Sequence, residues 1–175
     1  FWSSFFDSFV RACVPLFIVA SSYLQFPIHY SSGEFLRRRS VRILIPFLLW
    51  TIVYAFVWGE PVENFRNLIF NFNYSAGHLW FVYMLLGIYL IMPIISPWLE
   101  KVSARGERIF IALWFLSTAI PFLRAVAVSV RGGSPVIWGE ASWNEFHTLY
   151  YVSGFIGYVV TAHYIRKYVN WSVAK

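Results

Sequence analysis

Four arginines lie close together in the stretch Glu34–Pro46, between two long apolar segments, and could bind an anion. They are Arg37, Arg38, Arg39 and Arg42. We expect a helix that begins near Ser32 to carry them. On that helix Arg42 follows Arg38 by four residues and Arg39 by three, and either spacing places two guanidiniums on one face. The amino end of the helix adds N–H groups and a positive dipole end, so the element would attract a phosphate.

The same arginines have a simpler explanation. Basic residues collect in the cytoplasmic loops of membrane proteins, whatever those loops bind. From these residues alone, both an anion site and a purely topological role stay open.

The composition is that of an integral membrane protein. The 175 residues are 59% hydrophobic and 13% charged, whereas soluble domains carry about 25% charged residues. The net charge of +6 follows membrane topology and does not indicate nucleic acid as a partner. Cys13 is the single cysteine, so no intrachain disulfide can form.

Five apolar segments predict an all-α, polytopic transmembrane helix bundle of about five spans. Each has roughly the 17–25 residues that a helix needs to cross the hydrocarbon, where backbone amides must be paired within the segment. Residues 1–175 are expected to be a single transmembrane segment of a larger membrane domain, because no start methionine or signal is present. The five segments are Phe5–Phe26, Val41–Trp58, Leu79–Trp98, Ile109–Val130 and Leu149–Ile165.

The distribution of Lys and Arg predicts the orientation of the bundle. The loops after the first, third and fifth segments hold ten of these residues, and the opposite side holds three, Arg66, Arg124 and Arg131. The basic side faces the cytoplasm. The amino end of the chain is therefore expected outside and the carboxyl end in the cytoplasm.

Other candidate residues lie near the outer ends of the segments. Arg11 falls inside the first segment, where an ionisable residue is by default a functional candidate, although Asp7 four residues earlier could simply pair with it. His78, Trp80 and Tyr83 begin the third segment, where they could bind substrate or only anchor the helix at the interface. The histidines show no metal-like spacing, so no metal site is expected.

Three stretches in register resemble the acyltransferase 3 family of bacterial membrane O-acyltransferases. Their order and spacing match the family's second, third and fourth helices, and the chain covers about half of a family member. The stretches are Arg11-Ala-Cys-Val-Pro15-Leu-Phe17 running into Ser21-Ser22-Tyr23-Leu24, Phe35-Leu-Arg-Arg-Arg39-Ser-Val-Arg42 running into Pro46, and Gly77-His78-Leu79-Trp80-Phe81 running into Tyr89 and Pro93.

The resemblance implies an enzyme of the bacterial cytoplasmic membrane that passes an acyl group, expected to be acetyl, from cytoplasmic acyl-CoA to a hydroxyl of a cell-surface or lipid-linked glycan. Arg39 and Arg42 would be the family's Arg-x-x-Arg pair and, with Arg38, would contact the CoA phosphates. CoA is then a donor substrate, and no bound cofactor is expected. The residues expected to contact the substrate are Arg11, His78, Trp80 and Tyr83.

Two positions depart from the family pattern. Ser22 stands where the family has a glycine, which would loosen a close helix contact. The family's essential histidine lies on its first helix, which is absent here, and a general base must reach the hydroxyl that it deprotonates. The residues present are therefore expected to be inactive on their own.

Two other functions compete with the enzyme. A transporter or flippase for a lipid-linked glycan would also have many spans, but such proteins usually carry interrupted helices and ionisable residues at mid-depth, which this sequence does not show. A non-catalytic membrane scaffold is the third alternative.

Overall fold

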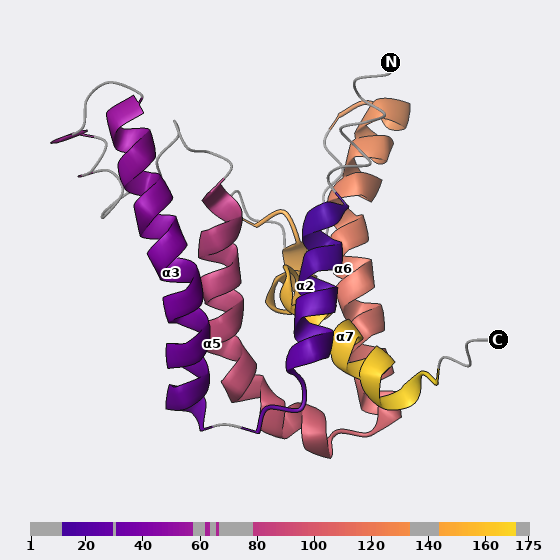
Figure 1. The fold of residues 1–175 in the computed structure, drawn as a ribbon. Helices are drawn as coiled ribbons and strands as arrows, with labels where there is room; N and C mark the ends of the chain where they lie inside the picture. The colour runs from indigo at the N-terminus through magenta and orange to yellow at the C-terminus, as the bar shows by residue number, and fades with distance from the viewer. Residues whose placement is uncertain are drawn as a thin grey trace, which may run out of the picture. The chain divides into compact units, whose positions relative to one another are not determined.

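We describe the chain from a computed structural model, which covers residues 12–29, 31–57, 62–63, 66, 79–133 and 144–170. Within these ranges every regular element is a helix (Figure 1). The elements are α2 (Cys13–Gln25), α3 (Ser32–Val57), α5 (Trp80–Lys101), α6 (Ala104–Arg131), the 3₁₀ helix η2 (His147–Val152) and α7 (Ile156–Tyr168).

Three of these helices are long and apolar enough to cross a membrane. They are α3, α5 and α6, with 26, 22 and 28 residues, and their apolar side chains are largely exposed in the described chain, as expected for surfaces that face lipid or further helices. The shorter α2 is also apolar, with 13 residues. The prediction of a helical membrane bundle is therefore confirmed. The orientation of the bundle stays a prediction.

The fifth predicted segment, Leu149–Ile165, is not one continuous helix. η2 ends at Val152, and Gly154 follows with a φ of +82°, a conformation that glycine adopts readily. α7 then has only 13 residues, or about 20 Å at 1.5 Å per residue, against a hydrocarbon core of about 30 Å. α7 is thus too short to span by itself, and the described part of the chain has three helices of spanning length.

The chain forms two compact units, which we describe separately. The first contains Phe1–Pro27 and Pro97–Lys175, and so includes α2, α6, η2, α7 and the last turn of α5. The second contains Ile28–Ser96, and so includes α3 and most of α5.

In the first unit α7 packs against both α2 and α6 (Figure 1). The contact with α6 is centred on Trp114, whose indole N–H donates to the carbonyl of Gly154 at 2.7 Å and whose ring meets Tyr158 edge-on at 4.6 Å. The indole also lies against Gly157, where a Cβ atom would come within 2.0 Å of it. The absence of a side chain at Gly157 is therefore what lets α6 and α7 approach.

The packing of α2 depends on one helix face. Its buried residues Ile18, Ser22 and Gln25 recur at intervals of four and three, the spacing of a single stripe. Ser22, the position where the related family has glycine, is 2% exposed. Serine is small enough to be buried in this stripe.

In the second unit two edge-to-face ring contacts join α3 to α5. Phe35 meets Tyr89 at 6.1 Å and Phe47 meets Tyr83 at 5.2 Å. Because the partner's number falls as the number along α3 rises, the two helices are antiparallel. α3 begins at Ser32, as the sequence predicted, and Ser31 caps it by accepting a hydrogen bond from the Glu34 N–H at 3.4 Å.

We expect Gly157→Ala to destabilise the protein, because the added methyl group meets the rigid ring of Trp114. Overpacking of this kind typically costs about 1–3 kcal/mol. The matched control is Gly87→Ala, since Gly87 lies within α5 and a Cβ atom there would meet nothing within 4 Å. Thermal unfolding of the full-length protein in detergent should show a lower midpoint for Gly157→Ala and an equal or higher one for Gly87→Ala. Equal midpoints for the two variants would contradict this account of the α6–α7 contact.

Candidate functional site

The four arginines lie in the second and third turns of α3 and differ in their partners. Arg38 donates to the Glu34 carboxylate four residues earlier, with Nη2 2.6 Å from Oε1. This exposed ion pair occupies part of the Arg38 guanidinium. In contrast, the structure gives Arg39 and Arg42 no ion pair or hydrogen bond with any described residue.

Arg37 likewise has no ion pair or hydrogen bond with a described residue, but of these three arginines only Arg39 and Arg42 share a face of the helix, so their guanidiniums can both turn to one ligand. Arg42 is exposed and Arg39 partly exposed, and their spacing of three places them about 60° apart around the helix. The expected help from the helix dipole does not extend to them. Arg39 is the eighth residue of α3, about 10 Å from its first residue, and the dipole effect fades within the first turn.

Of the four residues predicted to contact the substrate, two lie in the described part of the chain and two do not. Arg11 and His78 lie outside the described residues. Trp80 and Tyr83 begin α5 and are both partly exposed. Tyr83 packs against Phe47, which lies eight residues beyond Arg39, or about 12 Å along α3. Within the second unit the aromatic pair and the arginine row therefore lie at different depths.

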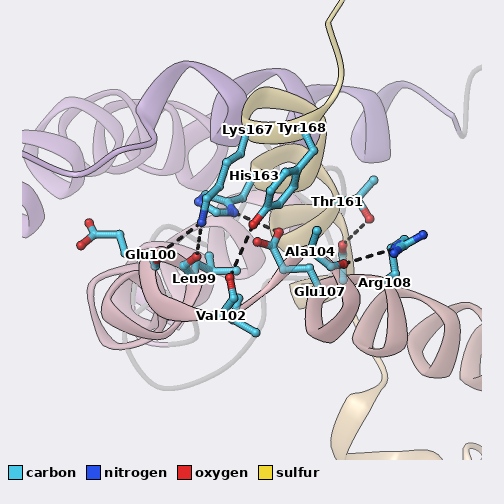
Figure 2. Close-up of polar contacts among 11 residues, drawn as sticks. Leu99, Glu100, Val102, Ala104, Glu107, Arg108, Thr161, His163, Lys167 and Tyr168 are labelled. Atoms are coloured by element: carbon cyan, nitrogen blue, oxygen red, sulfur yellow. Dashed lines mark hydrogen bonds and ion pairs between the residues drawn. The ribbon is translucent and has the colours of Figure 1, made fainter.

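A second group of polar residues, which the sequence did not reveal, lies in the first unit where α6 begins and α7 ends. Nδ1 of His163 is 3.0 Å from Oε2 of Glu107, and the two side chains are 8% and 0% exposed (Figure 2). The other oxygen of Glu107, Oε1, is buried with no hydrogen-bond partner among the described residues. Because a buried carboxylate is costly without a partner, the imidazole fixes Glu107 and Glu107 fixes the ring.

Basic residues in the last turn of α7 bind the ends of two other helices. Lys167 donates to the carbonyls of Leu99 and Glu100 at the end of α5, at 3.2 Å each (Figure 2). Arg166 donates to the carbonyl of Tyr23 near the end of α2, and its guanidinium lies over the Tyr23 ring at 5.4 Å. These cations complement the negative ends of both helices.

These residues surround a cavity of about 270 Å³. It is lined by Phe26, Pro27, Glu100, His163, Arg166 and Lys167. The ring of Phe26 meets the ring of His163 edge-on at 5.3 Å. The described part of the chain holds no group of three or more His, Cys, Asp or Glu side chains that could bind a metal ion.

One local signal for this site was present in the sequence. Arg166 and Lys167 follow His163 by three and four residues, so all three lie on one face of α7. The histidine was considered only as a metal ligand, and the two cations only as markers of orientation. The pairing of His163 with Glu107 crosses 56 residues, and no spacing rule indicates it.

A model of the acyltransferase 3 family, described as an acyltransferase domain, matches residues 1–174. The chain belongs to this family. No curated protein and no solved structure matches it. Family membership makes the protein a membrane acyltransferase, without defining its donor or acceptor.

We expect Glu107→Ala to destabilise the protein strongly, because it leaves the His163 ring buried without its acceptor. Breaking a buried pair by removing one partner costs about 3–5 kcal/mol, whereas replacing both partners with apolar residues costs much less. The midpoint of thermal unfolding should therefore be lower for Glu107→Ala than for the double variant Glu107→Met with His163→Leu.

The matched control is Arg108→Ala at the next position, where the side chain is exposed and, among the described residues, bonds only the Ala104 carbonyl, at 3.4 Å. The free energy of unfolding of this variant should stay within about 0.5 kcal/mol of the wild-type value. A midpoint for Glu107→Ala that equals the midpoint of the control would show that the buried pair contributes nothing.

Proposed function

We propose that the protein is a membrane-bound O-acyltransferase that moves an acyl group, acetyl in the simplest case, from cytoplasmic acyl-CoA to a hydroxyl of a cell-surface or lipid-linked glycan. The family membership supports acyl transfer. The three apolar helices support a membrane location, which we propose is the bacterial cytoplasmic membrane. The observation that supports acyl-CoA as the donor is the pair Arg39 and Arg42.

The pair suits a phosphate-rich donor. On one face of α3, two guanidiniums without an ion-pair partner among the described residues offer ten N–H donors in planar forks, and such forks match phosphate oxygens two at a time. CoA carries a pyrophosphate and a further phosphate, so one molecule can engage both arginines. Arg38 can add a third contact only in competition with Glu34, to which it is bonded.

The acceptor would lie at the other end of the second unit. Trp80 and Tyr83 offer aromatic faces and polar edges near the start of α5, a combination suited to sugar rings, and they lie at a different depth from the arginine row. His78 belongs to the same proposal, whereas Arg11 falls in the residue range of the first unit and stays a separate prediction from the sequence. The general base that deprotonates the hydroxyl is expected on a helix before this sequence, as the family resemblance implies.

We expect Arg39→Ala and Arg42→Ala, each made in the full-length protein, to raise the KM for acyl-CoA. A charge-assisted hydrogen bond contributes about 1.5–3 kcal/mol, which is about a 10- to 150-fold loss of affinity. Arg42→Lys should recover only part of the loss, because lysine keeps the charge without the planar fork.

The matched control is Arg37→Ala, which removes the same charge from an exposed position about 140° around the helix from Arg42. At equal membrane expression its KM should stay close to wild type. If all three alanine variants keep the wild-type KM, the arginines serve only to orient the chain and the donor site lies elsewhere.

A further inference from the structure

The cavity at the end of α7 holds basic groups that the proposed reaction does not use. Three of its lining residues, His163, Arg166 and Lys167, come from one face of α7. Two more, Phe26 and Pro27, follow the end of α2, and Glu100 comes from the last turn of α5. All of them belong to the first unit, so the cavity is a feature of that unit alone.

The cations in this cavity have hydrogen-bond partners but no carboxylate counter-ion among the described residues. Lys167 bonds two backbone carbonyls and Arg166 one. An ammonium has three N–H donors and a guanidinium five. After these bonds Lys167 still has one N–H donor and Arg166 has four. Backbone carbonyls are neutral, and both positive charges therefore remain available to an anion.

The two carboxylates nearby do not cancel these charges. Glu107 is committed to His163. Glu100 is exposed, and in the described chain no ion pair joins its carboxylate to Arg166 or Lys167. The helix carbonyls that the cations bind reduce the local positive potential only in part, because a helix end carries about half an elementary charge.

His163 presents its remaining nitrogen to the same space. Glu107 holds Nδ1, and Figure 2 shows the other nitrogen of the ring turned away from Glu107, on the side of Lys167. With Nδ1 donating to Glu107, this second nitrogen can donate to an anion only when the ring is an imidazolium, because in the neutral ring it is an acceptor. Glu107 does not line the cavity and acts on it only by positioning this ring.

We propose that this cavity binds a phosphate group through Arg166 and Lys167, with His163 as a further donor in its imidazolium form. A volume of about 270 Å³ exceeds what a phosphate alone requires, and the Phe26 ring offers an apolar wall for the part of the ligand that follows. Two sources supply this chemistry in a membrane protein, an anionic phospholipid head group and the phosphates of a CoA ester. The inference goes beyond the proposed function, because the cavity can bind phosphate whether or not the protein transfers acyl groups.

The test measures binding to the full-length protein in dodecyl maltoside, a detergent without phosphate. The two probes are coenzyme A and short-chain phosphatidylglycerol, each titrated while the thermal midpoint is followed, since a ligand that binds the folded state raises the midpoint saturably. The variants are Arg166→Gln and Lys167→Gln. The control is Arg105→Gln, which removes the same charge from an exposed position outside the cavity.

We expect at least one probe to bind wild type and the control alike, and to bind each cavity variant with a Kd weaker by about tenfold or more, as expected for the loss of a charge-assisted contact. The responding probe identifies the source of the phosphate. Arg166→Lys, which keeps the charge and a donor for the Tyr23 carbonyl, should bind with an intermediate Kd and guards against an effect of misfolding.

The proposal is overturned if neither probe binds, or if each binds Arg166→Gln, Lys167→Gln and Arg105→Gln with equal affinity. Coenzyme A binding that is lost only in Arg39→Ala and Arg42→Ala, with no response to phosphatidylglycerol, overturns it as well. Acyl transfer is assayed separately, so a failure of the proposed function leaves this result unaffected.

Discussion

Glu107 and His163 stand 56 residues apart in the chain, and the hydrogen bond between them joins the first turn of α6 to the second half of α7. A carboxylate that is fully buried among apolar helices has few acceptable partners, so this bond fixes the register of α7. The contact of Trp114 with Gly154 and Gly157 follows from the same register, seven residues further along α6. Arg166 and Lys167 then reach the ends of α2 and α5, and the cavity forms between them.

The two groups of basic residues show that positive charge alone does not define a role. On α3, Arg38 bonds a carboxylate, while Arg39 and Arg42 bond no described residue. On α7, both cations bond neutral helix carbonyls. An arginine paired with an acid is largely neutralised, whereas one without an acidic partner, or one bound to a carbonyl, keeps its charge for a ligand. These partners, which only the structure supplies, set Arg38 apart from the other arginines of α3, and the position around the helix then separates Arg39 and Arg42 from Arg37.

Hydropathy predicted the long helices well and their ends poorly. The second apolar segment begins only at Val41, whereas α3 begins at Ser32, a start that the polar residues before the arginines predicted and hydropathy alone did not, because the first turns of this helix are charged. The fifth segment is continuously apolar through Tyr150, Tyr151 and Val152. Its helical structure is nevertheless interrupted at Gly154. The Glu107–His163 pair could not be predicted, because contacts between distant helices depend on their packing and leave no periodic signal in one sequence.

The most direct test of the central claim is the sidedness of acyl transfer. Membrane vesicles that carry the full-length protein would receive radiolabelled acetyl-CoA, in one preparation with the cytoplasmic face outward and in the other with it inward. The account predicts that label enters a glycan hydroxyl when the donor reaches the cytoplasmic face and stays near the background of protein-free membranes when it does not. Equal transfer from both faces, or none above background in either preparation, would contradict it.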